Sequence, residues 1–210
     1  MSTILYIQAS PLPERSYSTT VADAFVRAYR ELHPRDMVMV KNLFDVDLPS
    51  FDGLKLTSKY AILHGQAPNE EQRASWRAVE AVIEEFLSAD KYVMAVPMWN
   101  FGIPYRLKHY LDLLVQPTYT FSFSPQSGYK GLVTGRPILV VYARGGEYLP
   151  GTGAEALDFQ KPYMERILGF IGFEDIRSLV VEPTLMGGAD TAGRKRQEAI
   201  ETARRMAEQF

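Results

Sequence analysis

Short apolar runs and amphipathic segments alternate along the chain. The runs are apolar at nearly every position, which is typical of strands buried on both faces of a sheet. They are Ile4 to Ala9, Met37 to Val40, Tyr92 to Met98, Pro137 to Ala143 and Leu179 to Glu182. Apolar residues recur at helical spacing in the segments that follow, at 18–33, 76–86, 107–114, 162–171 and 199–210. Strands that each lead to a helix predict a parallel sheet covered by helices on both faces.

Five strand–helix units in 210 residues fit a doubly wound α/β fold. We expect five parallel strands in the order 2-1-3-4-5, which is the flavodoxin-like arrangement. The segment from Leu43 to Pro68 has no sustained period, so it is expected to be a long connection with some local helix. No repeat, low-complexity tract or linker divides the chain, and a single domain over residues 1–210 is expected.

One segment, at about 116–135, interrupts the alternation of strand and helix. Tyr119, Phe121 and Phe123 alternate with hydroxyl residues, and a turn follows at 125–128. Alternation of this kind predicts a small β-excursion with one aromatic face. Two interpretations of that face remain open: a flap that covers the core, or a wall of a binding pocket.

Composition narrows the functional classes. A 46% hydrophobic and 23% charged content is ordinary for a soluble globular chain, and a net charge of −2 gives no strong positive field for nucleic acid or an anionic membrane. The absence of cysteine excludes disulfides, thiolate metal sites and cysteine nucleophiles. His33, His64 and His109 lack metal-ligand spacing, so no metal site is expected.

The chain enters an apolar strand without a basic leader, and no run approaches the ~20 apolar residues of a membrane helix. We therefore expect a cytoplasmic protein.

Ligands of doubly wound sheets lie beyond the carboxyl ends of the strands, at the point where the strand order reverses. The loop after the first strand, from Ser10 to Thr20, is rich in hydroxyls and opens into a helix. A helix N-terminus offers free N–H groups and a partial positive charge, so this loop suits a phosphate. Ordinary helix capping by serine or threonine is the alternative. The glycine motifs of dinucleotide- and triphosphate-binding loops are absent.

Two further loops reach the same edge of the predicted sheet. In the loop after the third strand, Trp99 and Phe101 can pack along a planar ligand, and Asn100 both donates and accepts hydrogen bonds. Core packing and a local turn are the alternative. After the fourth strand, Gly145 and Gly146 allow the backbone to approach a ligand closely, and a sharp turn is the alternative. Arg144 precedes them, and its side chain can pair either with a cofactor or with a carboxylate of the fold. Together the three loops suit a planar heterocycle with one phosphate, and flavin mononucleotide (FMN) is the natural candidate.

Over nearly its whole length the chain resembles the FMN-dependent NADH-azoreductases, which are flavodoxin-like quinone reductases. The residues that carry the resemblance are Ser10, Ser16, Tyr17, Ser18, Pro97, Met98, Trp99, Asn100, Phe101, Ala143, Arg144, Gly145 and Gly146, with Gly131 to Gly135 and Leu168 to Gly172. The resemblance implies a single FMN-binding domain, with the phosphate on Ser10 and Ser16 to Ser18 and the ring along Met98 to Phe101 and Ala143 to Gly146. It also places the 116–135 excursion near the flavin. Two positions depart from the commonest family form, because Trp99 stands where tyrosine is frequent and Ala143 where serine is frequent.

The resemblance implies an enzyme that passes two electrons from NADH or NADPH to quinones and azo compounds in ping-pong order. The flavin N5 would carry the hydride, and no catalytic side chain is assigned. A homodimer with two FMN sites at its interface is also implied, and Tyr119, Phe121 and Phe123 are then hypothesised to line the acceptor pocket. The alternative is a flavodoxin-type electron carrier that acts with protein partners. Such carriers are usually strongly acidic, whereas the net charge here is −2.

Overall fold

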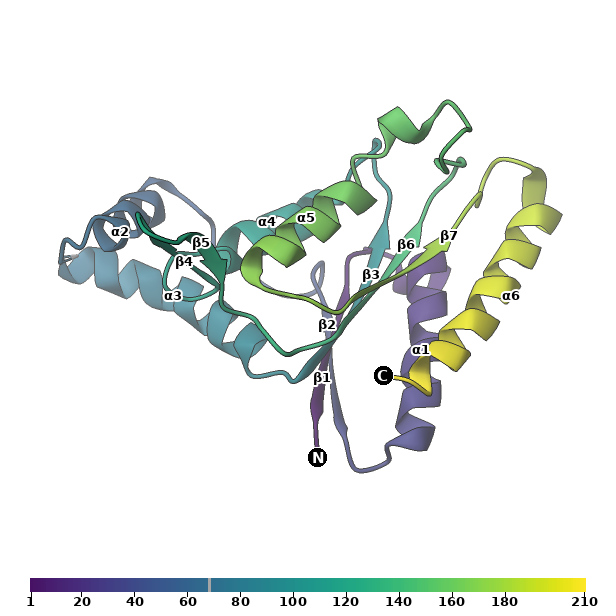
Figure 1. Cartoon of the computed structure of the whole chain (residues 1–210), viewed down its shortest axis with the longest axis horizontal. Helices are drawn as coiled ribbons and strands as arrows, with labels where there is room; N and C mark the ends of the chain where they lie inside the picture. Colours follow the sequence, from purple (N-terminus) through teal and green to yellow (C-terminus); the bar gives the residue numbers. More distant parts are fainter. Residues whose placement is uncertain (68) are drawn as a thin grey trace.

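The computed structural model describes residues 1–67 and 69–210. Its central sheet has five parallel strands in the order β2-β1-β3-β6-β7 (Figure 1). Their bounds are Thr3–Gln8 (β1), Met37–Asn42 (β2), Lys91–Pro97 (β3), Ile138–Ala143 (β6) and Ile176–Val181 (β7). When the strands of this sheet alone are numbered, the order is 2-1-3-4-5, so the predicted flavodoxin-like arrangement is confirmed.

Helices cover both faces of this sheet. Their bounds are Tyr17–Leu32 (α1), Gly53–Leu63 (α2), Glu70–Leu87 (α3), Tyr105–Leu114 (α4), Lys161–Ile171 (α5) and Gly188–Ala207 (α6), with 3-10 turns at Pro13–Arg15 (η1) and Glu155–Leu157 (η2). α1 and α6 pack on one face, whereas α3, α4 and α5 pack on the other. Alternate strand residues supply the two clusters: Val93 and Ala95 of β3 face α1 and α6, and Tyr92 and Met94 face the opposite side.

The unpatterned connection contains α2. This helix begins where the Asp52 side chain accepts a hydrogen bond from Lys55 N at 3.1 Å, which is an N-cap that hydrophobic periodicity does not reveal. Pro68, the last residue of the predicted connection, lies outside the described residues. None of the helices within the described residues is long and apolar enough to cross a membrane.

The prediction that the Met37 to Val40 run forms a buried strand is wrong in one respect. β2 is an edge strand with a single neighbour, β1, and the side chains of Met37 and Val40 are exposed. The predicted order already placed this strand at the edge, but an apolar run indicates only a strand and does not show how much of it neighbouring elements cover.

The excursion forms an antiparallel hairpin of β4 (Phe121–Ser124) and β5 (Gly128–Gly131), as the alternation predicted. Tyr119 precedes β4 and is not part of the strand. The hairpin is fastened to the end of α5, where Leu132 N and Val133 N donate to Ile171 O at 2.9 and 2.8 Å. Gly131 is required there, because a Cβ at this position would lie 2.3 Å from Gly172 N.

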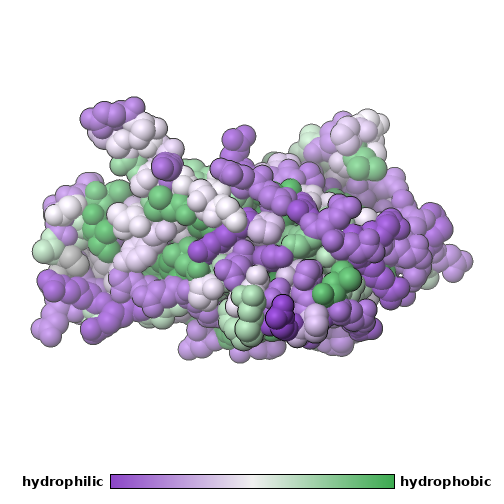
Figure 2. Space-filling model, turned by 60° about the horizontal axis from the view of Figure 1, so that its bottom comes forward, coloured by the Kyte–Doolittle hydropathy of each residue, from purple (hydrophilic) through white to green (hydrophobic). Residues whose placement is uncertain are grey.

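Apolar surface gathers at the end of the molecule that carries the hairpin. In Figure 2 the green surface is concentrated in the left half of the view, where Figure 1 places α2 and the hairpin, and the right half over α6 is mostly hydrophilic. The exposed apolar side chains of these elements are Leu56, Tyr60, Leu63, Phe123 and Tyr129. This group of five is called the hairpin-end patch below.

Candidate functional site

The first turn of α1 presents hydrogen-bond donors at the carboxyl end of β1. Ser16 is the N-cap of α1, and its Oγ accepts from Thr19 N at 3.3 Å and lies 3.0 Å from Ser18 Oγ. Ser10 is buried at the start of the same loop and accepts a hydrogen bond from Leu12 N. The structure thus confirms the capping interpretation for Ser16, and it brings Ser16 and Ser18 together.

The donor set of this turn fits a phosphate. Within residues 1–67 and 69–210, the N–H groups of Tyr17 and Ser18 have no hydrogen-bond partner, as expected for the first residues of a helix. The buried Thr19 Oγ1 also lacks a partner among the described residues. Free amides, hydroxyls and the positive end of the helix dipole are the groups that bind phosphate.

The loop after β3 is a tight turn in an uncommon backbone conformation. Trp99 N donates to Gly102 O at 3.0 Å, and Gly102 N donates to Trp99 O at 2.9 Å. The two central residues, Asn100 and Phe101, have positive φ values of 48° and 68°. Such values suit Asn-Gly, and they place a bulky phenylalanine in a strained region that costs about 1–3 kcal/mol. Strain of this kind is concentrated at ligand sites.

The aromatic side chains of this turn do not belong to the core. Trp99 is 36% and Phe101 44% exposed, so the structure excludes the core-packing alternative for both. The ring of Trp99 lies 5.8 Å from Phe44 and 6.3 Å from Tyr105, between centroids. Met98 N donates to Ala143 O at 2.8 Å, which joins this loop directly to the end of β6.

Gly145 and Gly146 form a turn beneath the loop between β7 and α6. A Cβ at Gly145 would lie 2.9 Å from Leu185 Cδ1, and a Cβ at Gly146 would lie 3.2 Å from Met186 Sδ. The side chains of Leu185 and Met186 are exposed, so they could move to admit a Cβ, and the absence of side chains at Gly145 and Gly146 chiefly leaves their backbone accessible. Among the described residues their N–H groups have no hydrogen-bond partner, so they remain free to bind a ligand.

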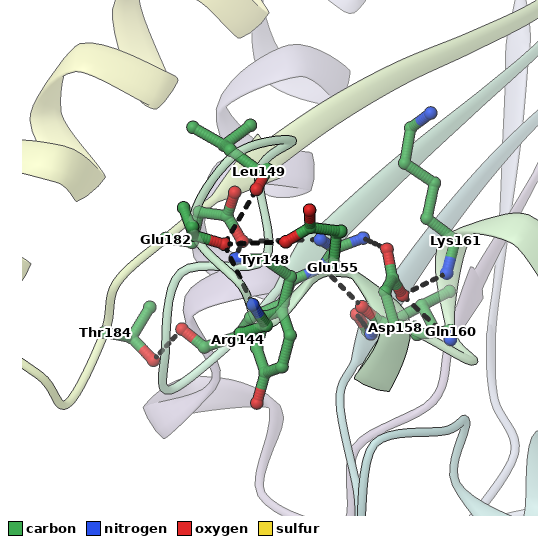
Figure 3. Close-up of polar contacts among 12 residues, drawn as sticks. Arg144, Tyr148, Leu149, Glu155, Asp158, Gln160, Lys161, Glu182 and Thr184 are labelled. Atoms are coloured by element: carbon green, nitrogen blue, oxygen red, sulfur yellow. Dashed lines mark hydrogen bonds and ion pairs between the residues drawn. The ribbon is translucent and has the colours of Figure 1, made fainter.

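The side chain of Arg144 is committed to the fold (Figure 3). Its guanidinium is 3% exposed and pairs with Asp158 Oδ2 at 2.8 Å and with Glu182 Oε2 at 3.3 Å. Its Nε donates to Gln160 Oε1 at 3.0 Å. The carboxylate alternative is thus the observed one, which leaves only the backbone of Arg144 for a cofactor. Sequence reasoning did not single out Asp158, Gln160 or Glu182, although a carboxylate at the end of an apolar strand run is a signal for a buried partner.

The three aromatic residues assigned to an acceptor pocket do not lie beside these loops within one chain. Tyr119 Oη donates to Glu80 Oε1, and burial together with this hydrogen bond raises the pKa of Tyr119. Phe121 is buried 4.9 Å from Phe170, between ring centroids. Phe123 is 56% exposed on the hairpin, which Figure 1 places beside α2 and α3, far from the loops that follow β3 and β6.

No group of three or more histidine, aspartate or glutamate residues in the described part of the chain is arranged to hold a metal ion. The candidate site consists of three loops at one edge of a doubly wound sheet. They offer free donors at the start of α1, an exposed aromatic turn after β3, and free glycine amides after β6. These features define a flavodoxin-like protein whose three loops bring hydrogen-bond donors and an exposed aromatic turn to one edge of the sheet.

Comparison with known proteins identifies the family. The model of the flavodoxin-like fold family matches residues 2–207, and the chain belongs to this family. A protein of Nitratidesulfovibrio vulgaris named FMN-dependent NADH:quinone oxidoreductase is 59% identical over 210 residues, which is the whole of both chains. One with the same name from Desulfotalea psychrophila is 48% identical over 93% of this chain and 91% of its own.

Solved structures agree with this assignment. An azoreductase of Bacillus anthracis str. Sterne has a TM-score of 0.90 at 29% identity, with all of both chains covered. An FMN-dependent NADH-azoreductase of Bacillus anthracis str. Ames Ancestor, in complex with FMN, has a TM-score of 0.84 at 28% identity over 99% of this chain and 100% of its own. The resemblance to the FMN-dependent NADH-azoreductases is confirmed.

Proposed function

We propose that the protein is an FMN-dependent oxidoreductase that transfers two electrons from NADH or NADPH to quinones and azo compounds. The observation that supports this proposal is that the loops after β1, β3 and β6 lie at one edge of the sheet. The first offers hydrogen-bond donors for a phosphate, the second an exposed aromatic turn, and the third free backbone amides. The names of the close relatives support the same activity.

The phosphate of FMN would be held by Ser10, by the side chains of Ser16 and Ser18, and by the free N–H of Tyr17. The ring would lie along Met98 to Phe101 and along the backbone of Ala143 to Gly146. Free N–H groups of Gly145 and Gly146 are suited to stabilise negative charge at the ring edge. Bound FMN supplies the hydride-accepting atom, N5, so the chain needs no catalytic side chain of its own.

With the ring along the Trp99–Gly102 turn, one face of the ring would remain for substrates. Donor and acceptor would use that face one after the other, which gives ping-pong order. The proposal includes a single domain over residues 1–210, and a cytoplasmic location, where NADH is the available donor.

A homodimer is part of the proposal. The hairpin-end patch is unpartnered in one chain, and exposed apolar patches of this kind mark interfaces. The hairpin that carries Phe123 lies far from the loops of its own chain (Figure 1), so in the proposed homodimer it would line the acceptor pocket of the partner subunit.

The test is a titration of the purified protein with FMN, followed by assays of NADH oxidation with and without a small quinone. About one FMN per chain and quinone-dependent oxidation of NADH are expected. Failure to bind FMN contradicts the proposal as a whole. Tight FMN binding without turnover of NADH and quinone favours an electron carrier instead.

A further inference from the structure

Three consecutive residues, Asp158 to Gln160, contact both of the loops that flank the proposed ring site. Asp158 Oδ2 lies 2.8 Å from Arg144 Nη2, at the end of β6. Phe159 N donates to Phe101 O at 3.0 Å, in the turn that follows β3. Gln160 contacts both sides, because its Nε2 donates to Val96 O at 2.9 Å and its Oε1 accepts from Arg144 Nε at 3.0 Å.

Arg144 is held at both its side chain and its backbone. Its guanidinium also pairs with Glu182 at the end of β7 (Figure 3). Its carbonyl oxygen accepts from Thr184 N at 2.8 Å and from Thr184 Oγ1 at 2.9 Å. Arg144 directly precedes Gly145, so these contacts fix the position at which the free glycine amides begin.

Burial of these charged groups is a costly way to stabilise a fold. The side chains of Arg144, Asp158 and Glu182 are 3%, 10% and 5% exposed, and Gln160 is fully buried. A buried ion-pair cluster is often no more stabilising than apolar residues of the same volume, because desolvation offsets the attraction. Its hydrogen bonds are directional, however, so it fixes geometry better than apolar packing does.

The turn after β3 needs such support. Asn100 and Phe101 have positive φ values, and strained backbone persists only where surrounding contacts determine it. Phe159, which lies outside the turn, donates a hydrogen bond from its N–H to the carbonyl oxygen of the strained residue Phe101.

We propose that Arg144, Asp158, Phe159, Gln160 and Glu182 form a clamp that positions the Trp99–Gly102 turn against the amides of Gly145 and Gly146. They are positioning residues, because their contacts act through the two loops. This inference rests on the proposed function, since those loops are the ones assigned to the flavin ring. The clamp is expected to set the affinity for the ring and not the affinity for the phosphate.

The test compares Arg144→Lys with Arg136→Lys, in the full-length protein. Arg136 lies just before the other end of β6, where its Nη1 donates to Leu87 O at 2.7 Å and to Tyr92 Oη at 3.0 Å. Both variants keep a cation and lose a guanidinium fork that the fold uses. Arg136 is thus a matched control at the edge of the sheet opposite the site.

Three measurements test the clamp. In protein freed of FMN, hydrogen–deuterium exchange should become faster at 98–103 and 144–147 in Arg144→Lys, and not in Arg136→Lys. In fluorescence titrations, Arg144→Lys should weaken FMN and riboflavin alike by about tenfold, and Arg136→Lys should leave both affinities within about twofold. The absorption bands of bound FMN should also shift only in Arg144→Lys.

A second variant, Gln160→Leu, replaces the amide with an apolar side chain of similar size. It removes the hydrogen bonds to Val96 and Arg144, and it should act in the same direction. If Arg144→Lys does not fold, Gln160→Leu decides the question by the same measurements. Unchanged exchange at 98–103 overturns the clamp, and so does faster exchange with unchanged flavin affinity. If the wild-type protein fails to bind FMN, both the proposed function and the clamp are overturned. If the wild type binds FMN and the variants bind it equally well, only the clamp is overturned.

Discussion

At the scale of single residues, Ser16 and Ser18 test the assignment of the phosphate. Replacement of both by alanine removes two hydroxyls that lie 3.0 Å apart at the start of α1. We expect FMN binding to weaken by about tenfold while riboflavin binding changes little, because riboflavin lacks the phosphate. Fluorescence titration of the flavin-free protein with both ligands measures the difference. Equal losses for the two ligands would contradict the assignment.

Ser16 also caps α1, so the double variant should be less stable. Loss of an N-cap costs about 0.5–2 kcal/mol. Ser18→Ala alone keeps the cap, since Thr19 N donates to Ser16 Oγ. The single variant loses the contact with Ser16 Oγ but not the cap, so it should be less destabilised than the double variant and should still lose part of the preference for FMN.

The charge of Asp52 is expected to make the stability of the protein depend on pH in the acid range. Hydrogen bonds from Lys55 N and Lys55 Nζ lower the pKa of Asp52 to about 2. The unfolded value is about 3.9, so the stabilising effect is complete above that pH and is lost as the pH falls toward the folded value. The gap in melting temperature between wild type and Asp52→Ala should be constant near neutrality and should shrink on acidification below about pH 4. A gap that widens on acidification would show that the charge of Asp52 has the opposite effect.

At the scale of elements, two phenylalanines of the hairpin, Phe121 and Phe123, are expected to have different roles, one in stability and one in substrate binding. Phe123 is 56% exposed, so Phe123→Ala should cost little stability, but it should raise KM for a bulky quinone or azo dye several-fold. Aromatic stacking contributes about 0.5–1.5 kcal/mol beyond buried area, which sets this size. Phe121→Ala is the matched contrast, because Phe121 is buried against Phe170 and its truncation should cost about 3–5 kcal/mol of stability. Lost stability or lost FMN with an unchanged KM for Phe123→Ala would make the hairpin a structural flap.

Sequence patterns were sufficient for elements whose signal is local. The runs at β1, β3 and β6 are buried on both faces, and for that reason their apolar residues were continuous in the sequence. The predicted strand order placed β2 at the sheet edge, but the exposure of Met37 and Val40 depends on which elements cover that edge, which no pattern within Met37–Asn42 contains. The start of α2 depends on a cap by Asp52 that a search for apolar spacing passes over.

The same distinction applies to the site. The three loops were predicted because each directly follows a strand, and the edge at which parallel strands end is fixed by topology. The partners of Arg144 were not predicted, because Gln160 and Glu182 are 16 and 38 residues away and come from other elements. The distance between the hairpin and the loops likewise depends on the packing of Gly131 against Gly172, which is a tertiary contact.

At the scale of the whole molecule, the hairpin-end patch predicts association. The protein should elute with twice the chain mass of 23.8 kDa in size-exclusion chromatography with light scattering. Phe123→Asp should shift it toward the monomer, because a charge on an apolar interface is costly to bury. A charge at an exposed position of α6, as in Gln197→Asp, is the control and should leave the mass unchanged. A fully active monomer would contradict the proposed dimer.

Sharing of one ring face predicts the form of the kinetics. Double-reciprocal plots of rate against NADH concentration, at several fixed quinone concentrations, should give parallel lines. Intersecting lines would indicate that donor and acceptor bind together, and the acceptor would then need a second place in the site.

Among residues 1–67 and 69–210, the sheet divides the buried apolar side chains into two clusters that have no side chain in common. Residues on α1 and α6 therefore adapt to one set of strand positions, and residues on α3, α4 and α5 adapt to another. Effects of substitutions that share no contacts tend to add. For sequence divergence, the two faces of the molecule can change at separate rates, since a compensating change is needed only within the cluster that was altered. A designer can exploit the same independence, and repack the α1–α6 face while leaving untouched the packing of α4 and α5, the helices that flank the aromatic turn and the clamp.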